Sequence, residues 1–323
     1  MGIAAARRNL RGQRQLSTIP ALIQGPKHMF QGSLVALVTP MTPDLAVDYA
    51  GLERLIEYHI AAGTDGLVIA GTTGESATLS TPEHIEVIGR ATEIVAGRVP
   101  VIAGTGSNST QQTIELSQAV GEFAIDAYLV VTPYYNKPTQ EGLFRHFTAI
   151  ADAVDKPVML YNVPGRTAVD LLPETVGRLG AHDNIFGIKE ATGEVERVTD
   201  IRNRCGDSFM LYSGDDATAR EFMLLGGHGV ISVTANVAPG QMAAMCAAAI
   251  AGDAEAAAAA DEPLSALHND LFVEANPIPV KWAVARQGLC GGALRLPLTE
   301  LSEAAQPQVI AALAKAGVDG PVA

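Results

Sequence analysis

The sequence predicts an α/β fold, a (β/α)8 TIM barrel with a small C-terminal helical domain. A short apolar run recurs eight times from residue 33 onward, and each run is followed by turn residues and a helical pattern. Most runs are near-continuous rather than alternating, which is typical of parallel strands covered on both faces. The strand signal stops after residue 236. Eight such units favour a closed barrel. A doubly wound sheet is the alternative and would usually show fewer units.

The predicted strands are short apolar segments of similar length. They are Leu34–Val38, Gly66–Ala70, Val99–Ala103, Ala127–Val131, Pro157–Tyr161, Ile185–Lys189, Phe209–Tyr212 and Gly229–Val233. Apolar residues at helical spacing between them predict helices, among them Asp48–Ala62, Pro82–Ala96 and Ser109–Phe123. Thr81-Pro82-Glu83 begins one helix with proline in a tolerated position, and Asn108, Ser109 and Thr110 offer caps for another.

Beyond residue 236 only helical patterns remain. The alanine- and methionine-rich segment Gln241–Ala260 is expected to form one helix. Three more patterns follow at Pro263–Phe272, Val280–Gln287 and Ala304–Ala316. We therefore expect a barrel over residues 29–252 that carries the active site, and a helical domain over residues 253–323.

The first 28 residues differ from the rest, because they hold five basic residues and no acidic one. An arginine-rich, acid-poor segment fits a transit peptide, whereas the broken apolar stretch Leu16–Ile23 is too short for a twin-arginine export signal. We favour a disordered extension or a start site at Met29.

Charge and composition exclude several functions. The net charge of −13 argues against a nucleic-acid partner, and the apolar segments are far shorter than a membrane span. Cys205, Cys246 and Cys290 are widely spaced and lack the spacing of a metal site. Three reduced cysteines in a cytoplasmic enzyme are therefore expected.

Reactive side chains stand where two of the predicted strands end. Lys189 closes the run that begins at Ile185, and Tyr161 closes the preceding run. Most lysines are solvated and protonated, but desolvation at a strand end would disfavour the ammonium form and free a nucleophile. If Lys189 points into the barrel, period two places Gly187 and Ile185 inward beneath it, and the glycine would leave room for an adduct.

Other strand ends add groups that could bind a carboxylate. Gly71-Thr72-Thr73-Gly74-Glu75 frames two hydroxyls with glycines, although a plain tight turn or a phosphate loop fits as well. Arg166 follows Tyr161 on the same rim and could bind a carboxylate bidentately or form a surface ion pair. Paired tyrosines such as Tyr134 and Tyr135 are more often packing residues.

Together these motifs resemble the dihydrodipicolinate synthase family, which belongs with the N-acetylneuraminate lyases among the pyruvate-dependent Schiff-base aldolases. The resemblance runs from Met29 to the last helix. Its strongest segments are Gly71–Ser76, Val130–Asn136, Tyr161–Thr167, Gly187–Gly193, Ser213–Asp216, Gly226–Asn236 and Asn276–Trp282. The wider pyruvate-lyase family generally lacks the arginine after the tyrosine. Arg166 therefore favours the dihydrodipicolinate synthases over the other members of that family.

The resemblance implies a lyase that condenses pyruvate with L-aspartate 4-semialdehyde, the first committed step of lysine biosynthesis by the diaminopimelate pathway. Lys189 would form the Schiff base. Tyr161 would move protons, relayed through Thr72 or Thr73 and Tyr135. Thr73 and the backbone of Ile231 would hold pyruvate with Gly214 nearby, and Arg166 would hold the semialdehyde carboxylate. No cofactor or metal is implied.

The resemblance also implies an assembly, in which Tyr135 reaches the partner's site within a homotetramer built as a dimer of dimers. Relatives that lysine inhibits bind it at positions that match Ser76, Ala77, His84, Asn108, Gln112 and Tyr134. Gln112 stands where those relatives have glutamate, and Thr81 where some have histidine. Since a charge partner for an ammonium group is lost, we expect weak or absent lysine inhibition.

Two other functions stay open at this point. Another Schiff-base aldolase of the same family, acting on a sugar acid, is disfavoured by Arg166 and the paired tyrosines. A catalytically silent barrel would be expected to lose Lys189 or Tyr161, and both are present.

Overall fold

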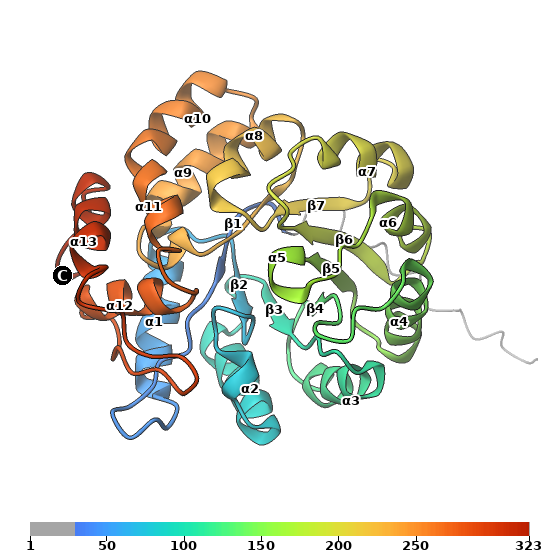
Figure 1. The fold of residues 1–323 in the computed structure, drawn as a ribbon, viewed down its shortest axis with the longest axis horizontal. Helices are drawn as coiled ribbons and strands as arrows, with labels where there is room; N and C mark the ends of the chain where they lie inside the picture. The colour runs from blue at the N-terminus through green and yellow to red at the C-terminus, as the bar shows by residue number, and fades with distance from the viewer. Residues whose placement is uncertain (1–29, 323) are drawn as a thin grey trace, which may run out of the picture.

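Eight parallel strands close into a barrel in the computed structural model, which describes residues 30–322 (Figure 1). The predicted extension over residues 1–28 lies outside the described residues. The strands are β1 (Gly32–Ala36), β2 (Gly66–Ile69), β3 (Val101–Gly104), β4 (Ala127–Val131), β5 (Val158–Asn162), β6 (Ile185–Glu190), β7 (Met210–Ser213) and β8 (Gly229–Ser232). Each pairs in parallel with its sequence neighbours, and β8 pairs with β1. The predicted (β/α)8 fold is confirmed.

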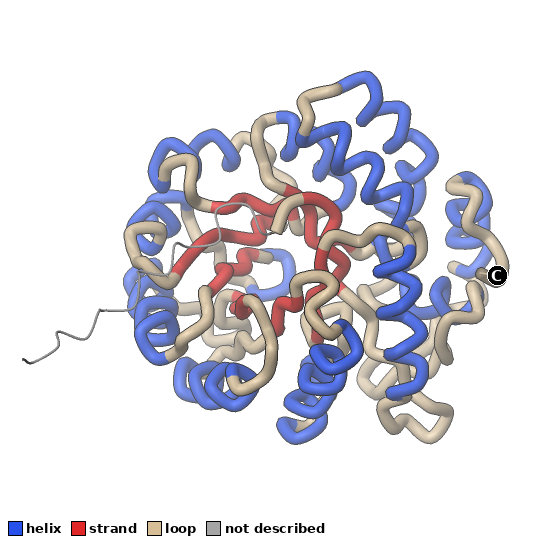
Figure 2. Tube along the Cα trace, turned by 180° about the vertical axis from the view of Figure 1, so that it is seen from behind, coloured by secondary structure: helices blue, strands red, loops and turns tan. Residues whose placement is uncertain are grey.

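Helices surround the strands on all sides (Figure 2). Those that follow the first seven strands are α1 (Tyr49–Ala61), α2 (Thr81–Val95), α3 (Thr110–Gly121), α4 (Gln140–Ala153), the short α5 (Pro164–Thr167), α6 (Pro173–Leu179), α7 (Arg197–Cys205) and α8 (Ala219–Leu224). Side-chain caps fix where several begin. Ser80 and Glu83 form a capping box at α2, and Ser109 accepts the Gln112 N–H at α3.

The C-terminal part consists of helices joined by loops and lies along one side of the barrel (Figure 1). Its helices are α9 (Pro239–Ile250), α10 (Ala254–Asp261), α11 (Ser265–Asp270), α12 (Ile278–Arg286) and α13 (Gln306–Lys315). Helix α9 packs against β1 and β8 as well as against α10. The domain boundary at residue 252 stays a prediction, because α9 and α10 on its two sides pack directly against each other.

The single helix expected over Gln241–Ala260 is wrong, since the structure divides it into α9 and α10. Gly252 has a φ of +77°, a left-handed conformation that glycine adopts without steric cost and that ends a helix. The side chain of Asp253 then accepts the Ala256 N–H at 3.0 Å and caps the next helix. Alanine content gave no sign of this break.

Two apolar cores lie on the two faces of the strands. The larger core packs strands against helices, and the smaller one fills the barrel interior with residues such as Leu34, Val68, Ile102, Met159 and Met210. Both faces of each strand are buried, and this explains why most residues of the strands are apolar. Among the described residues, no helix combines the length and apolar character needed to cross a membrane.

Candidate active site

A cavity of about 130 Å³ lies at the carboxyl ends of the strands, the end where (β/α)8 enzymes hold their active sites. It brings together six of the eight catalytic and substrate-binding residues expected from the sequence. They are Thr72, Thr73, Tyr161, Arg166, Lys189 and Gly214. They come from the ends of β2, β5, β6 and β7, so the barrel gathers in space what the sequence separates.

The amine and the phenol are neighbours across one strand pair. Tyr161 of β5 and Lys189 of β6 are paired in register, and both side chains line the cavity. Lys189 Nζ lies 4.4 Å from the centroid of the Tyr161 ring, and the lysine is only 6% exposed. A buried primary amine beside a phenol at a cavity is an arrangement suited to imine formation, since the amine can act as nucleophile and the phenol can transfer protons.

A polar network outside the barrel fixes the ends of these two strands. The next residues along them, Asn162 and Glu190, face away from the cavity because strand side chains alternate. Asn162 Nδ2 donates to Glu190 Oε2 at 3.1 Å and to Asp170 Oδ1 at 2.7 Å. Arg197 holds Asp170 with two hydrogen bonds. Burial raises the pKa of the Glu190 carboxyl, and Asn162 and Arg197 offset part of this effect.

The prediction that Ile185 points into the barrel is wrong. The pairing of β5 with β6 shifts register between Val158 and Met159, which bulges β6 by one residue. Ile185 therefore belongs to the outer core, and Phe186 packs against the barrel interior. Gly187 stays opposite Met210 of β7.

Gly187 also does not provide space for an adduct. A Cβ built there would lie 2.4 Å from the Met210 carbonyl oxygen, so the glycine permits close approach of β7. The glycine that makes room for the lysine is Gly214, since a Cβ there would lie 2.8 Å from Lys189 Cε.

The threonine loop after β2 is anchored by a buried ion pair. Glu75 adopts a φ of +57°, a conformation that costs energy for a residue other than glycine. Its carboxylate pairs with the Lys281 ammonium of α12, and both side chains are completely buried. The backbone N–H of Arg295 donates a hydrogen bond to the other carboxylate oxygen of Glu75, Oε2, at 3.3 Å. Burial lowers the pKa of the Lys281 ammonium, and the Glu75 carboxylate offsets part of this effect.

Two expected site residues do not line this cavity. Tyr135 is 88% exposed at the loop after β4, with a φ of +74°. Ile231 is buried in β8 opposite Leu34 of β1, within the interior core. Val233, two residues farther along, reaches the cavity instead.

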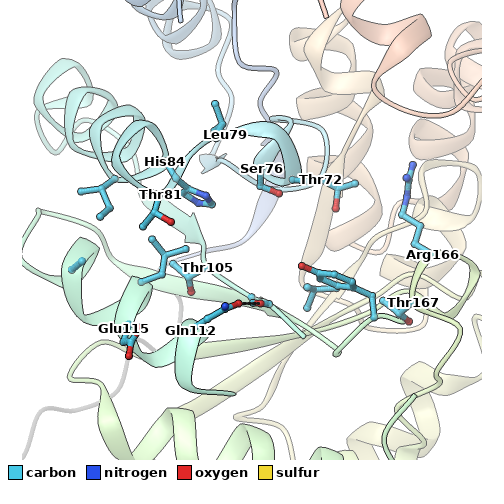
Figure 3. A pocket seen from close by; sticks show the side chains of 18 of the residues that line it. Thr72, Ser76, Leu79, Thr81, His84, Thr105, Gln112, Glu115, Arg166 and Thr167 are labelled. Atoms are coloured by element: carbon cyan, nitrogen blue, oxygen red, sulfur yellow. Dashed lines mark hydrogen bonds between the residues drawn. The ribbon is translucent and has the colours of Figure 1, made fainter. Parts of the chain in front are cut away.

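A second and larger cavity, of about 670 Å³, adjoins the first and shares Thr72 and Arg166 with it. Figure 3 shows Thr72 and Arg166 at one end and Thr81 and His84 at the other. Five of the six positions expected to bind lysine line it, namely Ser76, Ala77, His84, Gln112 and Tyr134. The sixth, Asn108, is absent from the lining, and its carbonyl accepts the Asn136 amide at 2.8 Å.

Donors and acceptors in the second cavity can be assigned from the hydrogen bonds. His84 Nε2 lies 2.7 Å from the Gly104 carbonyl oxygen, which can only accept, so Nε2 carries the proton. Burial lowers the pKa of His84. The neutral ring therefore keeps Nδ1 as an acceptor. Gln112 Oε1 accepts the Ser107 hydroxyl at 3.2 Å, drawn as a dashed line in Figure 3.

Sequence reasoning missed three features of these cavities. Asn276 lines the first cavity and binds Thr73. Glu115 lines the second cavity, one helical turn after Gln112. The Glu75–Lys281 pair had one visible signal, a lysine inside the apolar helix Ile278–Arg286. No sequence spacing links positions 75 and 281, so only the fold could pair them.

A closed (β/α)8 barrel with an amine, a phenol and a guanidinium around one cavity fits the class of Schiff-base lyases. Comparisons with known proteins agree with this class. The pattern of the dihydrodipicolinate synthetase family matches residues 29–316. The chain belongs to this family.

Individual relatives are similar over nearly their whole length. The 4-hydroxy-tetrahydrodipicolinate synthases of Alcanivorax borkumensis and Methylococcus capsulatus are each 59% identical over 290 residues, which cover 90% of this chain and 99% and 100% of theirs. The crystal structure of the chloride-inhibited dihydrodipicolinate synthase of Acinetobacter baumannii complexed with pyruvate is 52% identical, with a TM-score of 0.88. The match covers 90% of this chain and 99% of that one.

Proposed function

We propose that this chain condenses pyruvate with L-aspartate 4-semialdehyde to give 4-hydroxy-tetrahydrodipicolinate, in the diaminopimelate route to lysine. The observation that carries the proposal is the buried Lys189 amine, 4.4 Å from the Tyr161 ring centroid in a cavity that also holds Arg166. The family membership and the relatives of that name support the same reaction.

Lys189 is the nucleophile of the first half-reaction. Its amine adds to the carbonyl carbon of pyruvate, and the carbonyl oxygen leaves as water, which gives an imine. Tyr161 moves protons between the intermediate and solvent through Thr72 or Thr73 and Tyr135. Thr73 binds the pyruvate carboxylate, with the backbone of Ile231 and Gly214 nearby. The imine acidifies the neighbouring methyl group and so generates the enamine nucleophile.

Arg166 serves the second half-reaction by binding the semialdehyde carboxylate. A guanidinium suits this task because its planar fork matches a carboxylate bidentately. The enamine attacks the aldehyde carbon, and the substrate amine then attacks the imine carbon. Ring closure expels the Lys189 amine and regenerates the enzyme.

The working assembly is at least a dimer, and we propose a homotetramer built as a dimer of dimers. Tyr135 supports this, because its exposed side chain is not among those lining the cavity of its own chain. The second cavity is the proposed lysine site, with weak or absent inhibition. We place the enzyme in the cytoplasm, which fits its three free cysteines.

The decisive experiment measures pyruvate-dependent turnover of L-aspartate 4-semialdehyde, coupled to the downstream reductase so that product formation consumes a nicotinamide cofactor. Wild type is expected to turn over and Lys189→Ala to be inactive. Borohydride should trap pyruvate on wild type and not on the variant. Trapping without turnover would redirect the search to another aldehyde, such as the sugar aldehyde whose condensation with pyruvate gives a sugar acid. Full activity of Lys189→Ala would refute the mechanism.

A further inference from the structure

Asn276 has a buried hydrogen-bond acceptor, its Oδ1 atom, to which the proposed mechanism assigns no role. The residue is 6% exposed and lines the cavity beside Lys189, Thr73 and Arg166. Its Oδ1 atom is buried and has no hydrogen-bond partner among the described residues. A buried carbonyl oxygen without a partner costs about 1–3 kcal/mol, so a hydrogen bond from a molecule bound in the cavity would stabilise this atom.

The neighbours of Asn276 fix the orientation of its side-chain amide. The hydroxyl of Thr73 lies 3.0 Å from Asn276 Nδ2. A hydroxyl has a single proton, and Thr73 must donate that proton to bind the pyruvate carboxylate as proposed. It can therefore only accept from Asn276, which must present its NH₂ group to Thr73. Oδ1 is left as a pure acceptor.

The backbone of Asn276 sets where this acceptor lies relative to the second substrate. Arg166 Nη2 donates to the Asn276 carbonyl oxygen at 3.2 Å, so the two residues are in direct contact. Lys281, five residues after Asn276, forms the buried ion pair with Glu75. Glu75 lies two residues after Thr73, so this ion pair also connects the segment of Asn276 to the threonine loop. One short segment thus touches the groups proposed for both substrates.

We propose that Asn276 Oδ1 accepts a hydrogen bond from the α-amino group of the second substrate, and so selects an aldehyde that bears an amine next to its carboxylate. The inference rests on the proposed function. A carboxylate bound to Arg166 carries its amine on the adjacent carbon, within reach of a residue that contacts the guanidinium. A guanidinium only donates and cannot hold that amine. The hydrogen bond orients the nitrogen that must attack the imine carbon.

Asp215 is the competing acceptor, since its carboxylate also lines the cavity. One of its oxygens already accepts the backbone N–H and the hydroxyl of Thr218, at 3.2 and 2.7 Å. No hydrogen bond links Asp215 to Arg166 among those of the described residues, whereas Asn276 has one. The contact with the carboxylate-binding residue therefore favours Asn276.

The test compares L-aspartate 4-semialdehyde with 4-oxobutanoate, the same aldehyde without the amino group, at saturating pyruvate. Asn276→Leu should lower kcat/KM for the amino aldehyde about 10- to 100-fold. The inhibition constant of 4-oxobutanoate should change less than about threefold. Asn269→Leu, on the exposed side of α11, is the matched control and should change neither value.

Asn276→Asp separates the two roles of the side chain. It keeps an acceptor for the amine but cannot donate to Thr73, so the KM for pyruvate should rise while the preference for the amino aldehyde is kept. Equal losses for both aldehydes in Asn276→Leu would overturn the proposal, as would loss of the preference in Asp215→Asn instead. A wild-type enzyme with no turnover of L-aspartate 4-semialdehyde would refute the proposed function rather than this assignment.

Discussion

At the scale of single residues, two positions in the cavities carry a side chain whose size or charge affects binding. One is a glycine beside the reactive lysine, and the other is a neutral amide in the second cavity. Gly214 leaves the space that Lys189 occupies. Gln112 places a neutral amide on the second cavity, in which an ammonium group is proposed to bind. Each position therefore makes a prediction about one substitution.

Gly214→Ala should slow Schiff-base formation about 10- to 100-fold, because the new methyl group displaces the lysine from its near-attack position. A Cβ there lies 2.6 Å from Ala191 Cβ and 2.8 Å from Lys189 Cε, and the flexible lysine is the group that can move. The rate of Schiff-base formation is measured by adding borohydride at successive times after mixing with pyruvate and quantifying the trapped adduct. Gly240→Ala, where the nearest atom would be 3.7 Å away, is the control. An unchanged trapping rate would show that the lysine has room to spare.

Gln112→Glu should strengthen lysine inhibition about tenfold, since a carboxylate adds a charged hydrogen bond to the ligand ammonium group. Titration of activity with lysine measures the inhibition constants of both proteins. Gln118→Glu, at an exposed position of the same helix and outside the lining, controls for added charge. Strong inhibition of the wild type would contradict the prediction, and Glu115, which lines the same cavity, would then be the residue to examine.

At the scale of secondary-structure elements, the active site is held by contacts between segments far apart in the chain. The loop after β2 is fastened to α12 through Glu75 and Lys281, and the ends of β5 and β6 are joined through Asn162 and Glu190. Buried charges are costly unless they are paired. These pairs therefore couple the position of the catalytic groups to the packing of helices outside the barrel.

Lys281→Met should lower the free energy of unfolding by about 3–5 kcal/mol, because it leaves the Glu75 carboxylate buried without its partner. The double variant Lys281→Met with Glu75→Gln removes both charges and should recover part of that loss. Urea denaturation at fixed protein concentration measures both. If the double variant were no more stable than Lys281→Met, the unpaired carboxylate would not be the cause.

At the scale of the whole molecule, two properties follow from the burial pattern, namely stability toward acid and assembly. Burial lowers the pKa of His59 to about 3 and that of His146 to about 4. Both rings are therefore neutral in the folded protein at neutral pH. Their unfolded pKa is about 6.5, so on acidification the unfolded chain takes up these protons first.

The contribution of these histidines to stability is complete above pH 6.5 and is lost as the pH falls toward 3. At pH 5 each should cost about 2 kcal/mol of unfolding free energy relative to pH 7. His59→Gln cannot titrate and should reduce the slope of stability against pH between 6.5 and 4. Urea denaturation across this range, with the same variant at pH 8 as its own reference, gives the slope. An unaltered slope would assign acid sensitivity to other groups.

Assembly is tested by mixing two inactive variants. Tyr135→Phe should lose about 100-fold in turnover if the phenol relays protons, and Lys189→Ala should be inactive. If Tyr135 acts on the partner's site, mixed dimers regain one complete site, and an equimolar mixture should recover about a quarter of wild-type activity. No recovery after exchange of subunits, shown by fluorescence energy transfer between labelled chains, would place Tyr135 in its own chain's reaction or outside the chemistry.

The sequence by itself determined the architecture and most of the cavity, because both depend on local patterns. Apolar runs buried on two faces specify parallel strands, and groups that directly follow such strands must meet at one end of the barrel. Lys189, Tyr161 and Arg166 could be placed in this way. Tertiary structure alone decided the bulge at Phe186 and the pairing of Asn276 with Thr73 and of Lys281 with Glu75. These features depend on contacts between residues up to about 200 positions apart, for which the chain carries no periodic signal.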